Sequence, residues 1–465
     1  MNKTKIVCSI GPASDNICTL EKMIDAGMNV ARFNMSHGTH DSHKAMIDAV
    51  KQARTNKKTP VGILIDTKGP EIRIKQFENG KINLKNGDMF TLTTDDIFGD
   101  ASQVSVTYPK LPKILKKDAK ILLNDGMIEL KVEKVKGHNT LCSVINGGEL
   151  SNNKSINLPG IKTEMPYLSE QDKLDLLFAK YVEADFVAIS FVNCAQDVLD
   201  VKKYLKEISF SQVKVISKIE SEEGVKNFDS ILKVSDGIMV ARGDLGVEID
   251  FVRIPILQKQ FISKCNYQGK IVITATQMLE SMQGCPRPTR AEISDVANAI
   301  LDGTTAIMLS GETASGKFPV ESVQTMKDIA LETENYTKEA NVQIKTHNTS
   351  KSLGYATYAL SQTKDVEAIV VVTKSGKTAE NISRFRPKVP IIACTPSEKV
   401  CNKMTLLYGV VPMLDKAYKT MEDINTSSLA KALETKLVKC GDKVVLASGQ
   451  VPGKSGSNLL VVKKL

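Results

Sequence analysis

The 465-residue chain contains no tryptophan, and only 5% of its residues are aromatic. Surfaces that bind nucleic acid combine clustered basic residues with aromatic rings on which bases stack. Here the formal net charge is +9, but lysine and arginine are spread along the sequence. The composition therefore disfavours nucleic acid as a partner and favours small anionic substrates.

Long apolar runs are also missing. No stretch approaches the roughly 18 apolar residues of a membrane span, and the first residues, MNKTKIVCSIGPAS, lack a signal-peptide pattern. The nine cysteines stand singly, without a CxxC pair, which disfavours a disulfide framework or a zinc site. We therefore expect a cytoplasmic protein with reduced thiols and no membrane partner.

Short apolar runs recur through the first two thirds of the chain, and most are followed by an amphipathic helical pattern. They lie at residues 5–10, 29–34, 61–66, 185–192, 213–219, 236–241, 270–276 and 305–310. This alternation predicts a (β/α)8 TIM barrel with an insertion after its third strand. The barrel would comprise residues 1–70 and 167–344.

The predicted insertion, residues 71–166, has a different residue pattern, without the helical segments of the barrel. Its strand-like runs are separated by turn dipeptides such as Asn79-Gly80 and Asp125-Gly126, which predicts an all-β domain, a β-barrel that covers the active end as a lid. Strands and helices alternate again in residues 345–465, which predicts a carboxyl-terminal doubly wound α/β domain.

The predicted barrel strands end on polar residues, several of them in pairs two positions apart. Lys218 and Glu220 end one strand, and Arg242 and Asp244 end the next. Residues two apart on a strand share a face, and barrel enzymes carry their active sites at the carboxyl ends of the strands. Two neighbouring strands would thus present two cations and two carboxylates to a divalent metal and an anionic substrate.

The residue types divide this predicted site into parts. Glu220 and Asp244 suit one hard divalent cation, Mg²⁺ or Mn²⁺. Lys218 and Arg32 supply positive charge for a phosphoryl group in transfer, and the backbone amides of the turn that begins at Gly243 suit a carboxylate or phosphate. An oxygen-rich group with a single charge is better suited to a monovalent cation and consists of Asn34, Ser36, Asp66 and Thr67.

Seven segments together resemble pyruvate kinase, and the resemblance extends over essentially the whole chain. They are KTKIVCSIGPAS, MIDAGMNVARFNMSHG, LIDTKGPEIR, VISKIESEEG, IMVARGDLGVE, TATQMLESM and PTRAEISDVANAILDGTTAIMLSGETASGKFP. The resemblance implies transfer of a phosphoryl group from phosphoenolpyruvate to ADP, giving pyruvate and ATP in the last step of glycolysis. It also implies dependence on Mg²⁺ and K⁺ and a homotetramer.

The resemblance assigns roles to residues. Lys218 stabilises the transferring group and the enolate, Glu220 and Asp244 bind Mg²⁺, and the amides of Gly243 and Asp244 hold the substrate carboxylate together with Thr276. Arg32 contacts phosphate, and no side chain is named as the proton donor to the enolate. The implied nucleotide contacts are Arg32, His37, Arg73 and Lys154; the implied K⁺ ligands are Asn34, Ser36, Asp66 and the carbonyl of Thr67. Glu71 matches the K⁺-dependent branch of the family, and the chain departs from the family pattern at Asn124, Ser155 and Asn193.

The segment TKSGKTA follows a strand and opens a helix, an arrangement that suits an anion. In pyruvate kinases this loop and a later one, here residues 449–458, form the allosteric pocket. A sugar phosphate or AMP would then contact Thr373, Lys374, Ser375, Lys377 and Thr378. The alternative is a helix cap with solvated lysines.

Two other functions stay open from the sequence. Barrels that act as Mg²⁺-dependent lyases or aldolases on pyruvate enolates also pair a glutamate with an aspartate, and a catalytically inactive metabolite sensor would keep the effector domain. Lys218 argues against the lyase, which has no phosphoryl group to neutralise, and the complete set of charged residues argues against the sensor.

Overall fold

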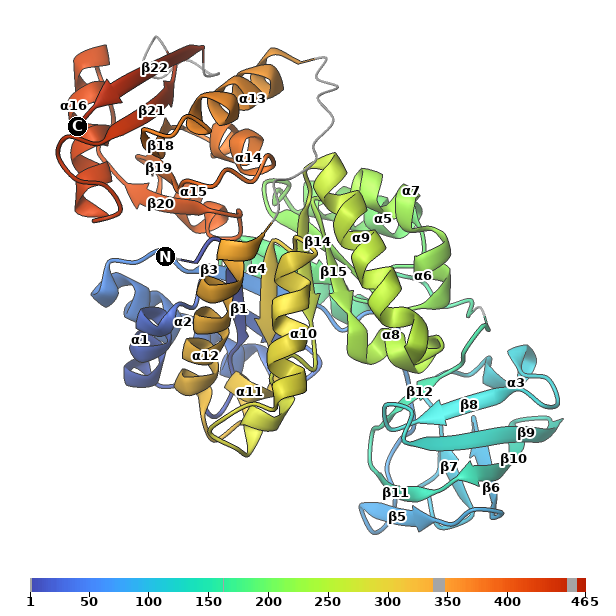
Figure 1. The fold of residues 1–465 in the computed structure, drawn as a ribbon. Helices are drawn as coiled ribbons and strands as arrows, with labels where there is room; N and C mark the ends of the chain where they lie inside the picture. The colour runs from blue at the N-terminus through green and yellow to red at the C-terminus, as the bar shows by residue number, and fades with distance from the viewer. Residues whose placement is uncertain (1, 162, 338–347, 450–457) are drawn as a thin grey trace.

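The computed structural model describes residues 2–161, 163–337, 348–449 and 458–465. A closed barrel of parallel strands lies in the middle, with an all-β domain and an α/β domain on opposite sides of it (Figure 1). Each barrel strand falls inside a run that the sequence predicts, so the (β/α)8 prediction is confirmed. The strands are β1 (Lys5–Ser9), β2 (Val30–Asn34), β3 (Gly62–Asp66), β13 (Phe186–Ile189), β14 (Lys214–Ile219), β15 (Gly237–Ala241), β16 (Ile271–Ala275) and β17 (Ala306–Leu309).

Helices surround the barrel and bury their apolar faces against it (Figure 1). Several begin at capping boxes: the side chains of Thr39, Ser169 and Thr289 each accept a hydrogen bond from the backbone N–H three residues on. The helices are α1 (Ile17–Ala26), α2 (His40–Lys57), α4 (Glu170–Tyr181), α5 (Ala195–Glu207), α6 (Glu222–Lys226), α7 (Phe228–Val234), α8 (Arg242–Glu248), α9 (Ile254–Gln268), α10 (Arg290–Leu301), α11 (Gly311–Ala314) and α12 (Pro319–Thr333).

The inserted segment forms a seven-stranded sheet in the order β4-β12-β8-β9-β10-β6-β7 and a separate pair, β11-β5. Ile74 and Val106, just beyond edge strands β4 and β7, form an antiparallel bridge, so the two edges meet. The elements are β4 (Ile72–Arg73), β5 (Lys81–Leu84), β6 (Met89–Thr93), β7 (Gln103–Ser105), α3 (Leu111–Ile114), β8 (Lys120–Leu123), β9 (Ile128–Lys136), β10 (Asn139–Asn146), β11 (Gly148–Ser151) and β12 (Ser155–Asn157).

The carboxyl-terminal sheet has the order β20-β19-β18-β21-β22. Four of its strands are parallel, which confirms the predicted α/β domain, and the edge strand β22 runs antiparallel to its neighbour. The connection from Ser448 to Leu459 is shorter than the dozen or more residues that a parallel crossover needs. The elements are α13 (Thr349–Ser361), β18 (Val366–Val372), α14 (Lys377–Ser383), β19 (Ile391–Thr395), α15 (Glu398–Met404), β20 (Val410–Leu414), α16 (Met421–Glu434), β21 (Lys443–Ser448) and β22 (Leu459–Lys464).

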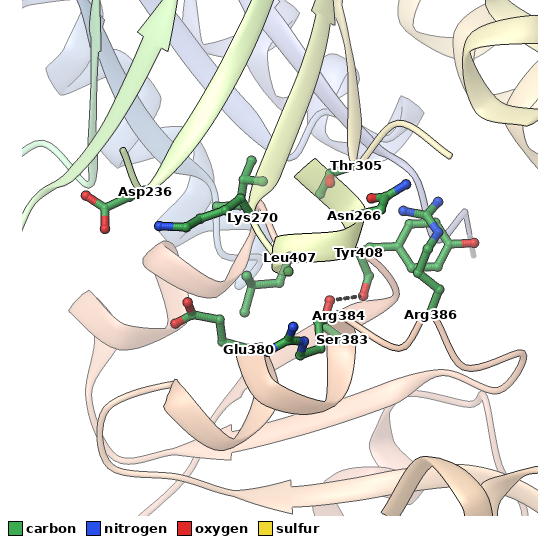
Figure 2. Close-up of a pocket in the computed structure, with 12 residues that line it drawn as sticks. Asp236, Asn266, Lys270, Thr305, Glu380, Ser383, Arg384, Arg386, Leu407 and Tyr408 are labelled. Atoms are coloured by element: carbon green, nitrogen blue, oxygen red, sulfur yellow. Dashed lines mark hydrogen bonds between the residues drawn. The ribbon is translucent and has the colours of Figure 1, made fainter. Parts of the chain in front are cut away.

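The carboxyl-terminal domain closes the amino-terminal end of the barrel. Inward-facing barrel residues such as Leu64 and Met239 share one apolar core with residues of β18 and β19, and the Lys5 ammonium donates to the Val410 carbonyl at 2.7 Å. A cavity of about 30 Å³ at this junction is lined by charged side chains from both domains, including Lys270 and Glu380 (Figure 2). That volume holds about two water molecules, so the opposite, carboxyl end of the barrel is the end available to substrates.

In the part of the chain that the structure describes, no helix combines the length and the apolar character needed to cross a membrane.

Candidate active site

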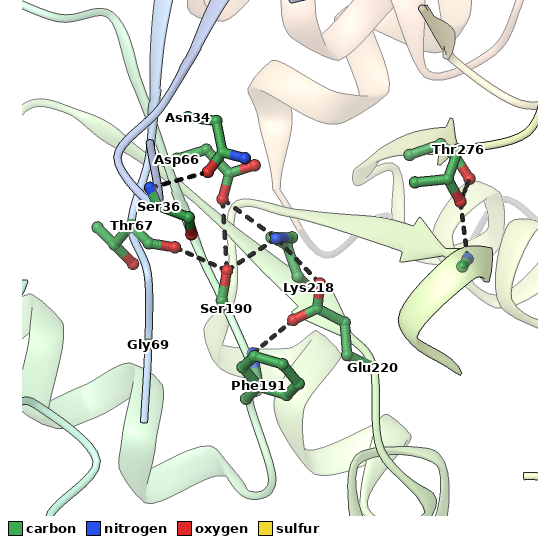
Figure 3. A network of polar contacts seen from close by, with 12 residues as sticks. Asn34, Ser36, Asp66, Thr67, Gly69, Ser190, Phe191, Lys218, Glu220 and Thr276 are labelled. Atoms are coloured by element: carbon green, nitrogen blue, oxygen red, sulfur yellow. Dashed lines mark hydrogen bonds and ion pairs between the residues drawn. The ribbon is translucent and has the colours of Figure 1, made fainter. Parts of the chain in front are cut away.

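Lys218 lies at the centre of a buried polar network at the carboxyl end of the barrel (Figure 3). Its Nζ lies 2.7 Å from the Ser190 Oγ, 2.9 Å from the Glu220 Oε1 and 3.2 Å from the Asp66 Oδ1. Burial acts to lower the pKa of Lys218, but the charges of Asp66 and Glu220 raise it above its ordinary value. The ammonium is therefore charged and held by oxygens from three neighbouring strands.

Arg32 is held by the same carboxylate. Its Nε donates to the Asp66 Oδ2 at 2.7 Å, and its Nη1 donates to the Ser9 Oγ at 2.7 Å. Burial acts to raise the pKa of Asp66, but the charges of Lys218 and Arg32 hold that pKa below its usual range. Asp66 is thus an ionised, fully buried carboxylate that holds Arg32 and Lys218 side by side, whereas the sequence assigns it only to the monovalent-cation group.

Glu220 follows Lys218 on the same face, and its Oε2 accepts a hydrogen bond from the Phe191 backbone N–H at 2.7 Å. Burial raises the pKa of Glu220 above its ordinary value; the positive charge of Lys218 opposes this shift and the negative charge of Asp244 adds to it. Two carboxylates whose charges repel one another suit a divalent cation, which would relieve the repulsion.

Among the described residues, no group of three or more aspartate, glutamate, histidine or cysteine side chains could hold a metal. A cation between Glu220 and Asp244 would therefore take its remaining ligands from substrate oxygens and water. This is the way in which Mg²⁺ is usually bound, so the residues present fit that ion.

Thr276 and Gly243 come together across the ends of β16 and β15. The Gly243 N–H donates to the Thr276 Oγ1 at 2.8 Å, and the Thr276 hydroxyl donates to the Ala275 carbonyl at 2.6 Å. Thr276 has a left-handed backbone, with φ at +69°. This conformation is costly for a β-branched residue and is found mostly at functional sites.

The sequence places Arg242 with the cations that face the substrate, and this part of the prediction is wrong. Its guanidinium donates to the carbonyl oxygens of Thr276 at 2.6 Å and Gln277 at 3.1 Å, and it pairs with Asp295 at 2.7 Å. Arg242, the first residue of α8, therefore fixes the left-handed turn after β16.

The four oxygen ligands predicted for a monovalent cation lie on β2 and β3 and just beyond them. Asn34 and Asp66 are register partners, the Asn34 Oδ1 accepts from the Ser36 N–H at 3.1 Å, and the Thr67 carbonyl accepts from the Ser190 Oγ at 2.7 Å. Carbonyl and carboxylate oxygens have two lone pairs, so these atoms keep capacity for an ion.

The four residues predicted to contact the nucleotide lie close enough for their charges to interact. Burial lowers the pKa of His37, and the positive charges of Arg73, Arg32 and Lys154 lower it further. These residues come from the barrel and from the inserted domain. Arg73 also pairs with Glu71 at 2.7 Å and donates to the Asn153 carbonyl at 2.6 Å, so its guanidinium is held at the join between the two domains.

Sequence reasoning missed two contributors to the site. Ser9 and Ser190 receive no role from the sequence, yet their hydroxyls accept hydrogen bonds from Arg32 and Lys218. The available signal was the position of each hydroxyl at the end of a buried barrel strand.

Asn193 is one of the positions at which the chain departs from the family pattern. Its side-chain oxygen accepts a hydrogen bond from the Ser221 hydroxyl at 2.5 Å, so the contact made there is neutral.

The predicted effector loop lies far from this site, at the start of α14. The Thr373 Oγ1 accepts from the Gly376 N–H at 3.0 Å, and Lys377 pairs with Glu380 at 3.0 Å, while Lys374 and Ser375 are exposed. Most of the second predicted loop, residues 450–457, falls outside the described residues.

Comparison with known proteins identifies the family. The family model described as "Pyruvate kinase, barrel domain" matches residues 1–323, and "Pyruvate kinase, alpha/beta domain" matches residues 351–463. The pyruvate kinase of Geobacillus stearothermophilus is 46% identical over 468 residues, covering 99% of this chain and 79% of the relative. That of Clostridium acetobutylicum is 45% identical over 471 residues, covering 100% and 99%, and that of Clostridium perfringens is 44% identical over 477 residues, covering 100% of both. The chain therefore belongs to the pyruvate kinase family.

Proposed function

We propose that the barrel site transfers the phosphoryl group of phosphoenolpyruvate to ADP with Lys218 as its central catalytic residue. Members of the family are phosphotransferases that make pyruvate and ATP in this way, and neither the lyase nor the sensor alternative is favoured by the comparisons. The observation that carries the residue assignment is the Lys218 ammonium, buried and held between Asp66 and Glu220 at the carboxyl end of the barrel.

Phosphoryl transfer depends mainly on position and on neutralisation of charge. Lys218 and Arg32 share Asp66 as a buried counter-ion, so both cations are in place before the substrate binds. Preorganised charges of this kind need no rearrangement during the reaction. Lys218 would stabilise the transferring group and then the enolate oxygen that the group leaves behind.

The start of α8 would bind the substrate carboxylate. The amides of Gly243 and Asp244 lie in its first turn, where backbone N–H groups have no helical partner. Before substrate binds, the Gly243 N–H donates to the Thr276 Oγ1 at 2.8 Å, a hydrogen bond that the carboxylate would replace. A carboxylate placed there would direct the phosphoryl oxygen towards Lys218.

Two cations complete the proposed site. Glu220 and Asp244 would hold Mg²⁺, or Mn²⁺, which when bound supplies positive charge to phosphoryl and enolate oxygens. Asn34, Ser36, Asp66 and the Thr67 carbonyl would hold K⁺. The phosphates of the nucleotide would lie near Arg32, His37, Arg73 and Lys154, because the positive charges of the other three all act on the pKa of His37.

The decisive assay measures pyruvate formation from phosphoenolpyruvate and ADP with Mg²⁺, in parallel K⁺ and Na⁺ buffers. We expect turnover in K⁺ that falls sharply in Na⁺. Equal turnover in both buffers would remove the monovalent-cation assignment, and no turnover in either, with candidate effectors present, would contradict the proposed function.

We also propose an effector site at the loop before α14 and a homotetramer, both from resemblance to the family. The support for the effector site is the cluster of exposed Lys374, exposed Ser375 and Lys377 at a helix start. Activity titrations with fructose 1,6-bisphosphate, ribose 5-phosphate and AMP test the site, and no response to any of the three would contradict it. Sedimentation analysis tests the tetramer.

A further inference from the structure

Two consecutive residues after β13, Ser190 and Phe191, contact Lys218 and Glu220 on one side. On the other side Ser190 contacts the two linkers that join the inserted β domain to the barrel, residues 67–71 before it and 163–169 after it. We call Ser190 and Phe191 the β13 turn. Phe191 has a left-handed backbone, with φ at +54°. A bulky side chain rarely adopts this conformation.

The β13 turn holds both charged residues that end β14. The Ser190 Oγ accepts from the Lys218 ammonium at 2.7 Å and donates to the Thr67 carbonyl at 2.7 Å (Figure 3). The Phe191 N–H donates to the Glu220 Oε2 at 2.7 Å. The turn therefore sets the direction of the ammonium and of the carboxylate together.

The same turn is in contact with both linkers. The hydroxyl of Tyr167, in the returning linker, donates to the Ser190 carbonyl at 2.9 Å. Gly69, in the outgoing linker, packs directly on the turn: a Cβ at this position would lie 2.9 Å from both the Ser190 Cβ and the Ser190 carbonyl oxygen. No side chain fits between the linker and the turn.

Asp172, at the start of α4, ties the two linkers to each other. Its Oδ1 accepts from the Gly69 N–H at 2.9 Å, and its Oδ2 accepts from the Ser169 N–H at 3.2 Å and the Ser169 hydroxyl at 2.6 Å. Since Asp172 is buried, these bonds are protected from water and join the two linkers beside the β13 turn.

We propose that the β13 turn is a positioning element that couples the hinge of the β domain to the Lys218–Glu220 pair. When the β domain moves, its linkers move Tyr167 and Gly69, which contact Ser190 from two sides. Ser190 in turn orients the Lys218 ammonium, and Phe191 orients the Glu220 carboxylate. Ser190 is thus a positioning residue for phosphoryl transfer, an inference that rests on the role proposed above for Lys218.

The most direct test removes the hydroxyl oxygen of Tyr167, in the linker after the β domain, and leaves Lys218 and Glu220 unchanged. Tyr167→Phe deletes the hydrogen bond to the Ser190 carbonyl without changing the packing of the ring. Tyr204→Phe is the matched control, because the Tyr204 hydroxyl also donates to a backbone carbonyl, that of Lys173 at 3.5 Å, on the outside of the barrel. One hydrogen bond of this kind corresponds to at most about a tenfold change in kcat.

For Tyr167→Phe we expect kcat to fall by about three- to tenfold, with the KM for phosphoenolpyruvate changed less than about twofold, because the interaction lost matters in the transition state. Hydrogen exchange gives a second readout that does not depend on activity. The peptide containing the Phe191 amide should exchange faster in Tyr167→Phe than in the wild type or in Tyr204→Phe.

A double-mutant cycle that combines Tyr167→Phe with Ser190→Ala then tests whether Tyr167 acts on Lys218 through Ser190. We expect Ser190→Ala to lower kcat by about tenfold or more. In its presence Tyr167→Phe should cause a smaller loss than in the wild type, because only the Phe191–Glu220 contact is then left to be disturbed. If Ser190→Ala does not fold, Ser190→Cys, which keeps the volume and weakens the hydrogen bonds, replaces it.

The proposal is overturned if Tyr167→Phe has the kcat and exchange rate of Tyr204→Phe, or if the losses of the two single variants multiply in the double variant. Either result would leave the proposed function intact, since that is decided by turnover of the wild type.

Discussion

Replacement of Lys218 by methionine is the most informative single change, because it removes one charge and keeps the length of the side chain. The ammonium contacts three oxygens, from Asp66, Ser190 and Glu220. Loss of one preorganised group that stabilises transition-state charge lowers kcat by about 100- to 1000-fold, or about 3–4 kcal/mol. Substrate binding should survive, since the start of α8 and the metal ligands remain.

The same change also leaves Asp66 and Glu220 without their shared cation. Removal of one partner from a buried ion pair costs about 3–5 kcal/mol of stability. The assay must therefore combine kcat per folded enzyme, the KM for phosphoenolpyruvate and a thermal melt. Lys5→Met is the matched control, because Lys5 is only 2% exposed but lies at the opposite end of the barrel. It should lose stability and retain kcat.

The reasoning is refuted if Lys218→Met keeps kcat within about tenfold of the wild type, since that loss equals an ordinary hydrogen bond and not a charge that stabilises the transition state. A fall in kcat that Lys5→Met reproduces would also refute it, because the loss would then reflect stability alone.

The remaining predictions concern three other residues. Glu71→Lys should reduce the dependence of kcat on K⁺, because an ammonium would replace the cation's charge beside Arg73; a variant that still needs K⁺ as strongly as the wild type would contradict the assignment. Asp185 is buried, and burial raises its pKa to about 7. The stability that its neutral form contributes is present below the unfolded value near 3.8 and is lost as the pH rises through 7. Asp185→Asn should therefore raise the free energy of unfolding, by up to about 4 kcal/mol at pH 8 and by less at pH 5, as measured by urea denaturation; an equal gain at both pH values would count against the raised pKa. Ser375→Asp should abolish activation by a sugar phosphate or AMP, through charge repulsion, while basal kcat stays unchanged; activation curves that match the wild type would place the effector elsewhere.

The sequence alone determined the barrel and the identity of most candidate residues. The barrel strands are short apolar runs in a regular alternation with amphipathic helices, a pattern that local residue preference and periodicity express directly. The spacing of Lys218 and Glu220 placed them on one face of one strand, and the structure keeps them there. Resemblance to the family then supplied the reaction and its substrates.

Only the tertiary structure decided how those residues are connected. Asp66 pairs with both Arg32 and Lys218 because β2, β3, β13 and β14 are neighbours in the closed barrel. No local sequence pattern shows which side chains meet across the barrel. Arg242 has the same strand-end position as Lys218, yet it reaches a backbone turn. The Ser190 contacts with Lys218, Tyr167 and Gly69 arise from strand ends and linkers that are distant in sequence. Periodicity reports which face of a strand is buried, whereas the partner of a buried polar group depends on long-range packing, so that information exists only in the folded chain.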